Sequence, residues 1–175
     1  MKIVSIFADR LFAFHYEGEV DNEYDRLLEL WTDTEYVRSF LNKNKRDIPQ
    51  EKTKRKFVEY IYEDATSIDE QLIRITETTN ESLSHFFQPL HNQEYQFKIL
   101  SLQKGRQHCL RLYAIKIDEE TFIITGGAIK LPLHHLMKDR KHTRIELQKL
   151  EKAKSYLKEN GIFDEDSFFE FLKEN

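Results

Sequence analysis

Cysteine is almost absent from the sequence, and this limits the scaffolds that the chain can form. The single cysteine, Cys109, cannot make a disulfide within the chain, and zinc sites built from several cysteines are excluded. It lies in an apolar strand pattern, which favours a buried, unreactive thiol. Glycine and proline are also scarce, with five and three residues, and no Ser/Gly-rich stretch forms a linker. We therefore predict one domain over residues 1–175.

Long hydrophobic runs are missing too. No stretch approaches the roughly 20 apolar residues that a membrane-spanning helix needs. Asp9 and Arg10 interrupt the apolar N-terminus, unlike the core of a signal peptide. The sequence therefore predicts a cytoplasmic protein that has no membrane partner.

Motifs for cofactors and metals are absent as well. The chain has no phosphate-binding P-loop, no dinucleotide-binding glycine pattern, no HExxH motif and no nucleophile elbow. The adjacent histidines His134 and His135 lack the spacing of metal ligands on a helix. We therefore expect neither a cofactor nor a metal ion.

The charge of the chain is unevenly distributed. Residues 96–144 contain ten Lys or Arg and four Asp or Glu, a charge of +6, which leaves −10 for the rest of a chain whose net charge is −4. An acidic chain does not bind nucleic acid over its whole surface. The asymmetry permits an anionic partner on one face, although solvated surface charge produces the same pattern.

Hydrophobic periodicity predicts an α+β fold with a mainly helical first half. Two apolar runs within residues 2–16 indicate an N-terminal β-hairpin, and helical spacing then dominates up to residue 85. The second half is expected to be an antiparallel β-meander followed by helices. Its expected strands and helices span residues 95–102, 109–117, 122–129, 143–157 and 164–172.

These elements divide the single domain into three parts. Residues 1–85 form a helical extension, residues 86–160 the meander and its helix, and residues 161–175 a C-terminal helix. Residues 103–108 and 118–121 are expected to be the turns of the meander, since Gly105 and an acid pair mark them. Thr143 and Glu146 have the spacing of a helix-capping box.

Tight hairpins would bring several cations to one face of the meander. The expected cross-strand pairs are Ile115–Ile124, Tyr113–Gly126, Arg111–Ala128, Leu102–Cys109 and Lys98–Tyr113. Because strand side chains alternate between faces, Lys98, Arg111 and Lys130 would then lie on the same face as Tyr113. The alternative, in which Lys98 or Arg111 only extends past the core or pairs with an acid, stays open at this point.

The order and spacing of these residues resemble one family. The matching runs are Phe97-Lys98-Ile99, Lys104-Gly105-Arg106, Leu110-Arg111-Leu112-Tyr113, Ile123 to Lys130, and Thr143-x-x-Glu146-Leu147 with Ala153. Together they are similar to the RelE/HigB-like toxin ribonucleases of type II toxin–antitoxin systems, over about residues 86–157. The family often has two successive basic residues where this chain has Lys130-Leu131, and His134 or His135 is the candidate replacement.

The resemblance implies an endoribonuclease that cleaves messenger RNA, on the ribosome or free, and that binds a cognate antitoxin protein. By position, Lys98, Arg111 and Lys130 match the basic active-site residues of the family, and His135 is the expected acid or base. In this assignment Arg111 and Lys130 stabilise the phosphate, and Lys98 transfers a proton or contacts phosphate. The expected RNA-binding residues are Lys104, Arg106, His108 and Tyr113.

Two other functions fit the same sequence. The domain could keep the fold without the chemistry and bind a protein, as the ParE branch of the superfamily does, or act as a silent adaptor. It could also be a structural or regulatory protein whose basic strands are only solvated. Expression of the protein distinguishes the three functions. Growth arrest with message cleavage indicates the nuclease, arrest without cleavage the binding module, and no effect the structural protein.

Overall fold

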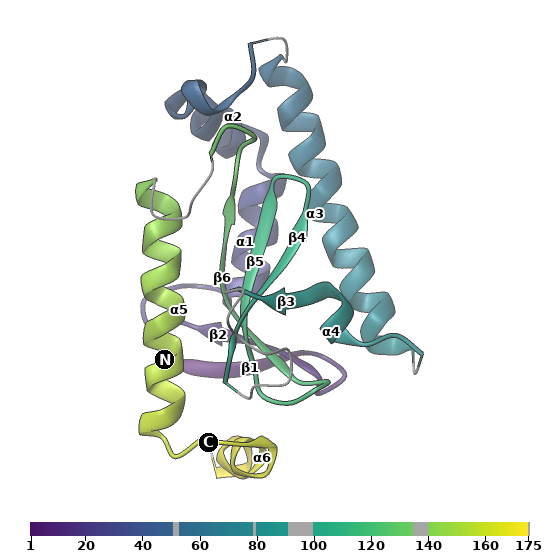
Figure 1. Cartoon of the computed structure of the whole chain (residues 1–175), viewed down its shortest axis with the longest axis vertical. Coiled ribbons are helices and arrows are strands. Elements are labelled where there is room, and N and C mark those ends of the chain that lie inside the picture. The colour runs from purple at the N-terminus through teal and green to yellow at the C-terminus, as the bar shows by residue number, and fades with distance from the viewer. Residues whose placement is uncertain (51–52, 79, 91–99, 135–139, 175) are drawn as a thin grey trace.

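The computed structural model describes residues 1–50, 53–78, 80–90, 100–134 and 140–174, and it has the predicted α+β class (Figure 1). The N-terminal hairpin and the helical first half are confirmed. In chain order the elements are β1 (Lys2–Phe7), β2 (Leu11–His15), α1 (Glu23–Thr32), α2 (Thr34–Lys43), the 3-10 turn η1 (Lys45–Asp47), α3 (Lys54–Glu77), α4 (Leu83–Phe86), β3 (Phe87–Pro89), β4 (Leu102–Gln107), β5 (Leu110–Lys116), β6 (Phe122–Ile129), α5 (Lys141–Glu159) and α6 (Glu165–Glu174).

The strands form one sheet in the order β1-β2-β6-β5-β4-β3. The N-terminal hairpin therefore belongs to the same sheet as the meander, which the sequence did not predict. Strand β2 runs parallel to β6, with Leu11 opposite Phe122, and the other strand pairs are antiparallel. This parallel contact joins the N-terminal hairpin to the meander and places β6 in the interior of the sheet.

Helices cover both faces of the sheet, and strand alternation determines which side chains meet which helices. Leu110, Leu112 and Ala114 of β5 share a buried cluster with residues of α1, α2 and α3. Tyr113 and Ile115 of the same strand belong to a second cluster with residues of α5 and α6. Figure 1 shows α3 and α5 on either side of the β4–β5 hairpin.

The first hairpin of the meander differs from its prediction. Strand β4 covers most of residues 103–108, which were expected to be a turn, and the turn is only His108-Cys109, because Gln107 pairs with Leu110. Gly105 serves packing instead of a turn: a Cβ there would lie 2.1 Å from Cε1 of Phe86. The expected pair Leu102–Cys109 is wrong, because Leu102 lies opposite Ile115. Most of the expected strand at 95–102 falls outside the described residues.

The second hairpin confirms the pairs Tyr113–Gly126 and Arg111–Ala128. Near the turn the expected pair Ile115–Ile124 is wrong, because Ile115 lies opposite Ile123. Thr125 is an extra residue in β6, a β-bulge, and beyond it the strands pair in the expected register from Tyr113–Gly126 onward. The hydroxyl of Thr125 donates to the carbonyl oxygen of Tyr113 at 3.2 Å. The bulge also moves Ile124 to the α1–α3 side of the sheet.

Candidate functional site

Three strands bring four cations to the face of the sheet that α5 covers. Arg106 of β4 lies opposite Arg111 of β5, and Lys104 lies opposite Tyr113, two residues further along. Lys130 follows Ala128 by two residues, so both point to the same face, and its backbone N–H donates to the carbonyl oxygen of Cys109 at 2.7 Å. We call Lys104, Arg106, Arg111 and Lys130 the basic cluster.

The members of the basic cluster raise the positive potential at one another. Burial lowers the pKa of Lys104, and the charges of Arg111, Lys130 and Arg106 lower it further. Burial likewise lowers the pKa of Arg111, and the charge of Arg106 acts in the same direction. An anion bound among these groups would offset the repulsion between their charges.

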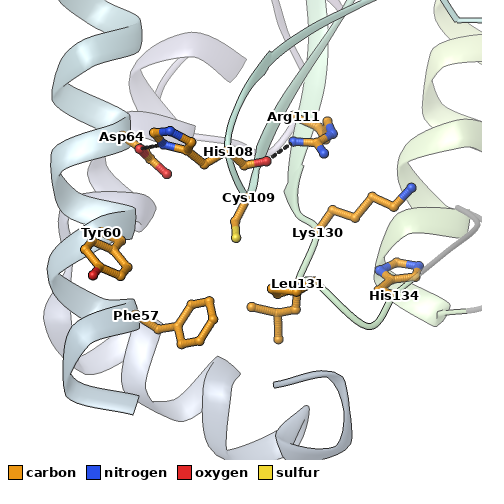
Figure 2. A pocket seen from close by; sticks show the side chains of 10 residues that line it. Phe57, Tyr60, Asp64, His108, Cys109, Arg111, Lys130, Leu131 and His134 are labelled. Atoms are coloured by element: carbon orange, nitrogen blue, oxygen red, sulfur yellow. Dashed lines mark hydrogen bonds and ion pairs between the residues drawn. The ribbon is translucent and has the colours of Figure 1, made fainter. Parts of the chain in front are cut away.

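A cavity of about 600 Å³ lies beside the basic cluster at the end of the β4–β5 hairpin. Its lining comes from α3, from the hairpin and from the segment after β6: Phe57, Tyr60, Asp64, His108, Cys109, Arg111, Lys130, Leu131, Pro132 and His134. Figure 2 shows the His108 ring directed toward Asp64 on α3, while the Arg111 and Lys130 side chains extend the other way. The cavity thus joins an aromatic and acidic wall to a cationic rim.

The turn at the end of the hairpin is fixed by two side-chain contacts. Nδ1 of His108 lies 2.5 Å from Oδ1 of Asp64, and Nη1 of Arg111 donates to the carbonyl oxygens of His108 at 2.5 Å and Leu110 at 2.8 Å. The Asp64 side chain is only 6% exposed, whereas that of His108 is 75% exposed. Burial raises the pKa of Asp64 more than the hydrogen bond with His108 lowers it.

The structure brings together five of the eight predicted site residues. Arg111, Lys130 and His108 line the cavity. Lys104 and Arg106 belong to the basic cluster through their cross-strand pairing, but they line a second cavity with residues of α3 and α4. The expected pair Lys98–Tyr113 is wrong, because Lys104 occupies the place opposite Tyr113. Lys98 and His135 lie outside the described residues.

Tyr113, the remaining predicted site residue, is buried beneath α5. It is 1% exposed, and its hydroxyl has no hydrogen bond to any residue that the structure describes. Burial raises its pKa well above the usual range, and the charge of Glu146 acts in the same direction. Contact between Tyr113 and RNA stays a prediction, and it would require α5 to move away from this residue.

Sequence reasoning missed the contribution of α3 to the cavity. Phe57, Tyr60 and Asp64 come from this helix, which ends well before the hairpin begins at Leu102. One signal was available: Asp64 lies between Ile61 and Ile68 on the apolar face of α3, and an acid at such a position must find a partner. The partner itself, His108, could not be identified without the tertiary fold.

A second charged network holds β6 in place between α1 and α5. Oε2 of Glu146 accepts the Gly127 N–H at 3.1 Å, and Nζ of Lys149 lies 2.6 Å from Oε2 of the buried Glu23. Burial raises the pKa of Glu146, and the charge of Glu23 raises it further. The capping box expected from Thr143 and Glu146 is wrong: α5 begins at Lys141, and Glu146 binds the strand instead of its own helix.

Comparisons with protein-family models, with curated proteins and with solved structures found no match to the chain. The family suggested by the sequence motifs therefore stays a prediction. Across the described ranges, no group of three or more His, Cys, Asp and Glu side chains is placed to hold a metal ion. In the same part of the chain, no helix combines the length and the apolar character needed to cross a membrane.

Proposed function

We propose that this chain is a RelE/HigB-like toxin, an endoribonuclease that cleaves messenger RNA, on the ribosome or free, and that a cognate antitoxin protein restrains it. The observation that carries the proposal is the basic cluster beside the cavity. Two strands that the motifs identified, β5 and β6, bring Arg111 and Lys130 to the same rim. The motifs and the α+β class support the family, and the cations support the chemistry.

Cleavage of this kind forms one bond and breaks another at a single phosphorus. The 2′-oxygen of the RNA attacks its neighbouring phosphate and loses its proton, the bond from phosphorus to the 5′-oxygen breaks, and the 5′-oxygen takes a proton. Negative charge accumulates on the phosphate oxygens in between, and preorganised cations stabilise that charge. Arg111 and Lys130 supply this stabilisation.

The remaining cations extend the binding surface along the strands. Lys104 and Arg106 lie next to Arg111 on the same face, which suits them to the phosphates that flank the scissile one. At the other end of the cavity, the 46% exposed Tyr60 offers aromatic surface on which an unpaired base can stack. Single-stranded RNA fits such a combination of cations and an exposed aromatic ring.

One observation favours the protein-binding alternative. Nη1 of Arg111 already donates to two backbone carbonyl oxygens, so part of the guanidinium serves the hairpin and not a ligand. A ParE-like module or a silent adaptor would need Arg111 only for this structural role.

Induced expression in a bacterial host separates the two candidates. The wild-type chain, Arg111→Ala, Lys130→Ala and a matched control, Lys152→Ala on the exposed side of α5, are compared for growth and for message integrity. We expect arrest and message cleavage with the wild type and the control, and loss of both with the other two variants. Arrest with intact message would favour the protein-binding module. No growth effect, together with no RNA affinity at low salt, would refute both.

A further inference from the structure

His108 occupies a backbone position that usually belongs to glycine. It is the first residue of the two-residue turn between β4 and β5, and its φ of +39° lies in the left-handed region. A side chain there costs roughly 1–2 kcal/mol relative to glycine. The chain nevertheless has a histidine at this point, so other contacts must offset the strain.

Two contacts hold His108 in this conformation, one at the ring and one at the backbone. The ring meets Asp64, which projects from the middle of the 24-residue helix α3. The carbonyl oxygen accepts from Arg111, a member of the basic cluster. His108 thereby connects the acidic wall of the cavity to its cationic rim.

The contact with Asp64 determines which ring nitrogen is available to a ligand. When a carboxylate accepts the Nδ1–H, the neutral imidazole carries its lone pair on Nε2. Burial raises the pKa of Asp64, which makes its carboxylate a stronger acceptor for that N–H. An imidazole oriented by an acid on one nitrogen, with the other nitrogen available, has the arrangement of a general base.

We propose that His108 is a catalytic residue and Asp64 a positioning residue in the ribonuclease reaction, an inference that rests on the proposed function. Nε2 of His108 takes the proton of the 2′-hydroxyl as the 2′-oxygen bonds to phosphorus. The bond from phosphorus to the 5′-oxygen breaks, and the 5′-oxygen takes a proton from water. The products are a 2′,3′-cyclic phosphate and a 5′-hydroxyl, and His108 then returns its proton to solvent.

Other titratable and charged groups line the same cavity, and the experiment must separate them from His108. They are Tyr60 and Asp64 from α3, Cys109 and Arg111 from the hairpin, and Lys130 and His134 from the segment after β6. His134 carries the other imidazole in this lining, so its contribution must be separated from that of His108. Substitutions at residue 108 therefore identify which group produces any pH dependence of the rate.

Two substitutions remove the base and leave the turn intact. Asparagine tolerates a positive φ, and its amide can donate to Asp64, so His108→Asn keeps both the backbone and the contact. Glycine removes the backbone strain altogether, and His108→Gly leaves room for free imidazole. Asp64→Asn tests the positioning role. Unfolding of each variant is followed by circular dichroism, with Lys152→Ala as the control.

The assay measures kcat and KM of the full chain on an end-labelled single-stranded RNA and on ribosome-bound message from pH 5 to pH 9. We expect His108→Asn and His108→Gly to lose about 10²–10⁴-fold in kcat with KM nearly unchanged. The rise of wild-type kcat with pH that a general base produces should disappear, and added imidazole should restore part of the His108→Gly rate. Asp64→Asn should lower kcat, with KM unchanged, and shift the pH profile.

The outcomes separate this inference from the proposed function. Cleavage by His108→Asn and His108→Gly at the wild-type rate would overturn the role of His108 and leave the nuclease proposal standing. The absence of wild-type cleavage on both substrates would overturn the proposed function, and the role of His108 with it. A wild-type pH profile that persists in both His108 variants would assign the titration to another group.

Discussion

Gly127 lies where β6 packs closely against the backbone of β5 and the side chains of α1, and replacing it by alanine tests the packing of the site. A Cβ at this position would lie 2.8 Å from the carbonyl oxygen of Arg111, 2.9 Å from Cδ1 of Leu27 and 2.9 Å from the ring of Trp31. Real Cβ atoms essentially never come within 3.0 Å of another heavy atom. The oxygen belongs to the backbone of β5, so it cannot turn away as a side chain can.

Two opposing effects determine the size of the destabilisation. Overpacking of a core costs typically about 1–3 kcal/mol. Replacing glycine by alanine recovers about 0.4–1 kcal/mol, because it reduces the conformational entropy of the unfolded chain. We therefore expect Gly127→Ala to lower the free energy of unfolding by about 1–2 kcal/mol, which for a domain of this size is a fall in Tm of roughly 2–8 °C.

Thermal and urea unfolding of Gly127→Ala, Leu27→Ala and the double variant measure both the clash and its origin. Leu27→Ala removes one of the three close atoms, so the two substitutions should be coupled, by about 0.5 kcal/mol or more. The displacement of β5 should also reduce RNA cleavage, because it moves the backbone of Arg111. A Gly127→Ala protein as stable as the wild type would refute this description of the β5–β6 contact.

Three further predictions concern the charges around the sheet. The pKa of Glu146 is raised, so the native state binds its proton more tightly than the unfolded chain does. The free energy of unfolding should therefore fall as pH rises from about 4.3 through the raised pKa. Urea unfolding at a series of pH values should show a weaker fall for Glu146→Gln than for the wild type. The hydrogen bond from Arg140 lowers the pKa of Asp47, so its stabilisation is present above the unfolded pKa of about 3.9 and is lost as pH falls through the lowered value. Asp47→Asn should cost about 1.5–3 kcal/mol at pH 7, and a difference from wild type that did not shrink in acid would contradict this. Lys104→Ala should reduce the slope of log RNA affinity against log salt by about 0.7, and an unchanged slope would exclude a phosphate contact.

Local patterns in the sequence predicted the elements that depend on neighbouring residues. Strand β6 has the bounds 122–129 that its apolar run indicated, and the pairs Tyr113–Gly126 and Arg111–Ala128 followed from a tight turn. The bulge at Thr125 and the parallel contact between β2 and β6 were not predicted, because they depend on packing between residues that are distant in the sequence. An extra residue shifts the phase of an alternating pattern, but β6 is buried at every position, so it has no alternation in which the shift could be seen.

The sequence predicted the cations of the candidate site but not the residues that α3 contributes to it. Lys104-Gly105-Arg106 was interpreted as a turn, because glycine between polar residues is typical of one. Gly105 is instead a strand residue that accommodates the ring of Phe86, and this moves the strand's cations up to the hairpin end. Asp64 and His108 are 44 residues apart, and only the packing of α3 against the hairpin brings them together.

The central claim, that the basic cluster cleaves RNA, is tested most directly by the products of the purified full-length chain. End-labelled single-stranded RNA and ribosome-bound message are incubated with the wild type, with Lys130→Ala and with Lys152→Ala. We predict fragments that end in a 2′,3′-cyclic phosphate for the wild type and the control, and a loss of about 10²-fold or more in rate for Lys130→Ala. Intact RNA on both substrates with the folded wild type, or equal rates for the wild type and Lys130→Ala, would contradict the account.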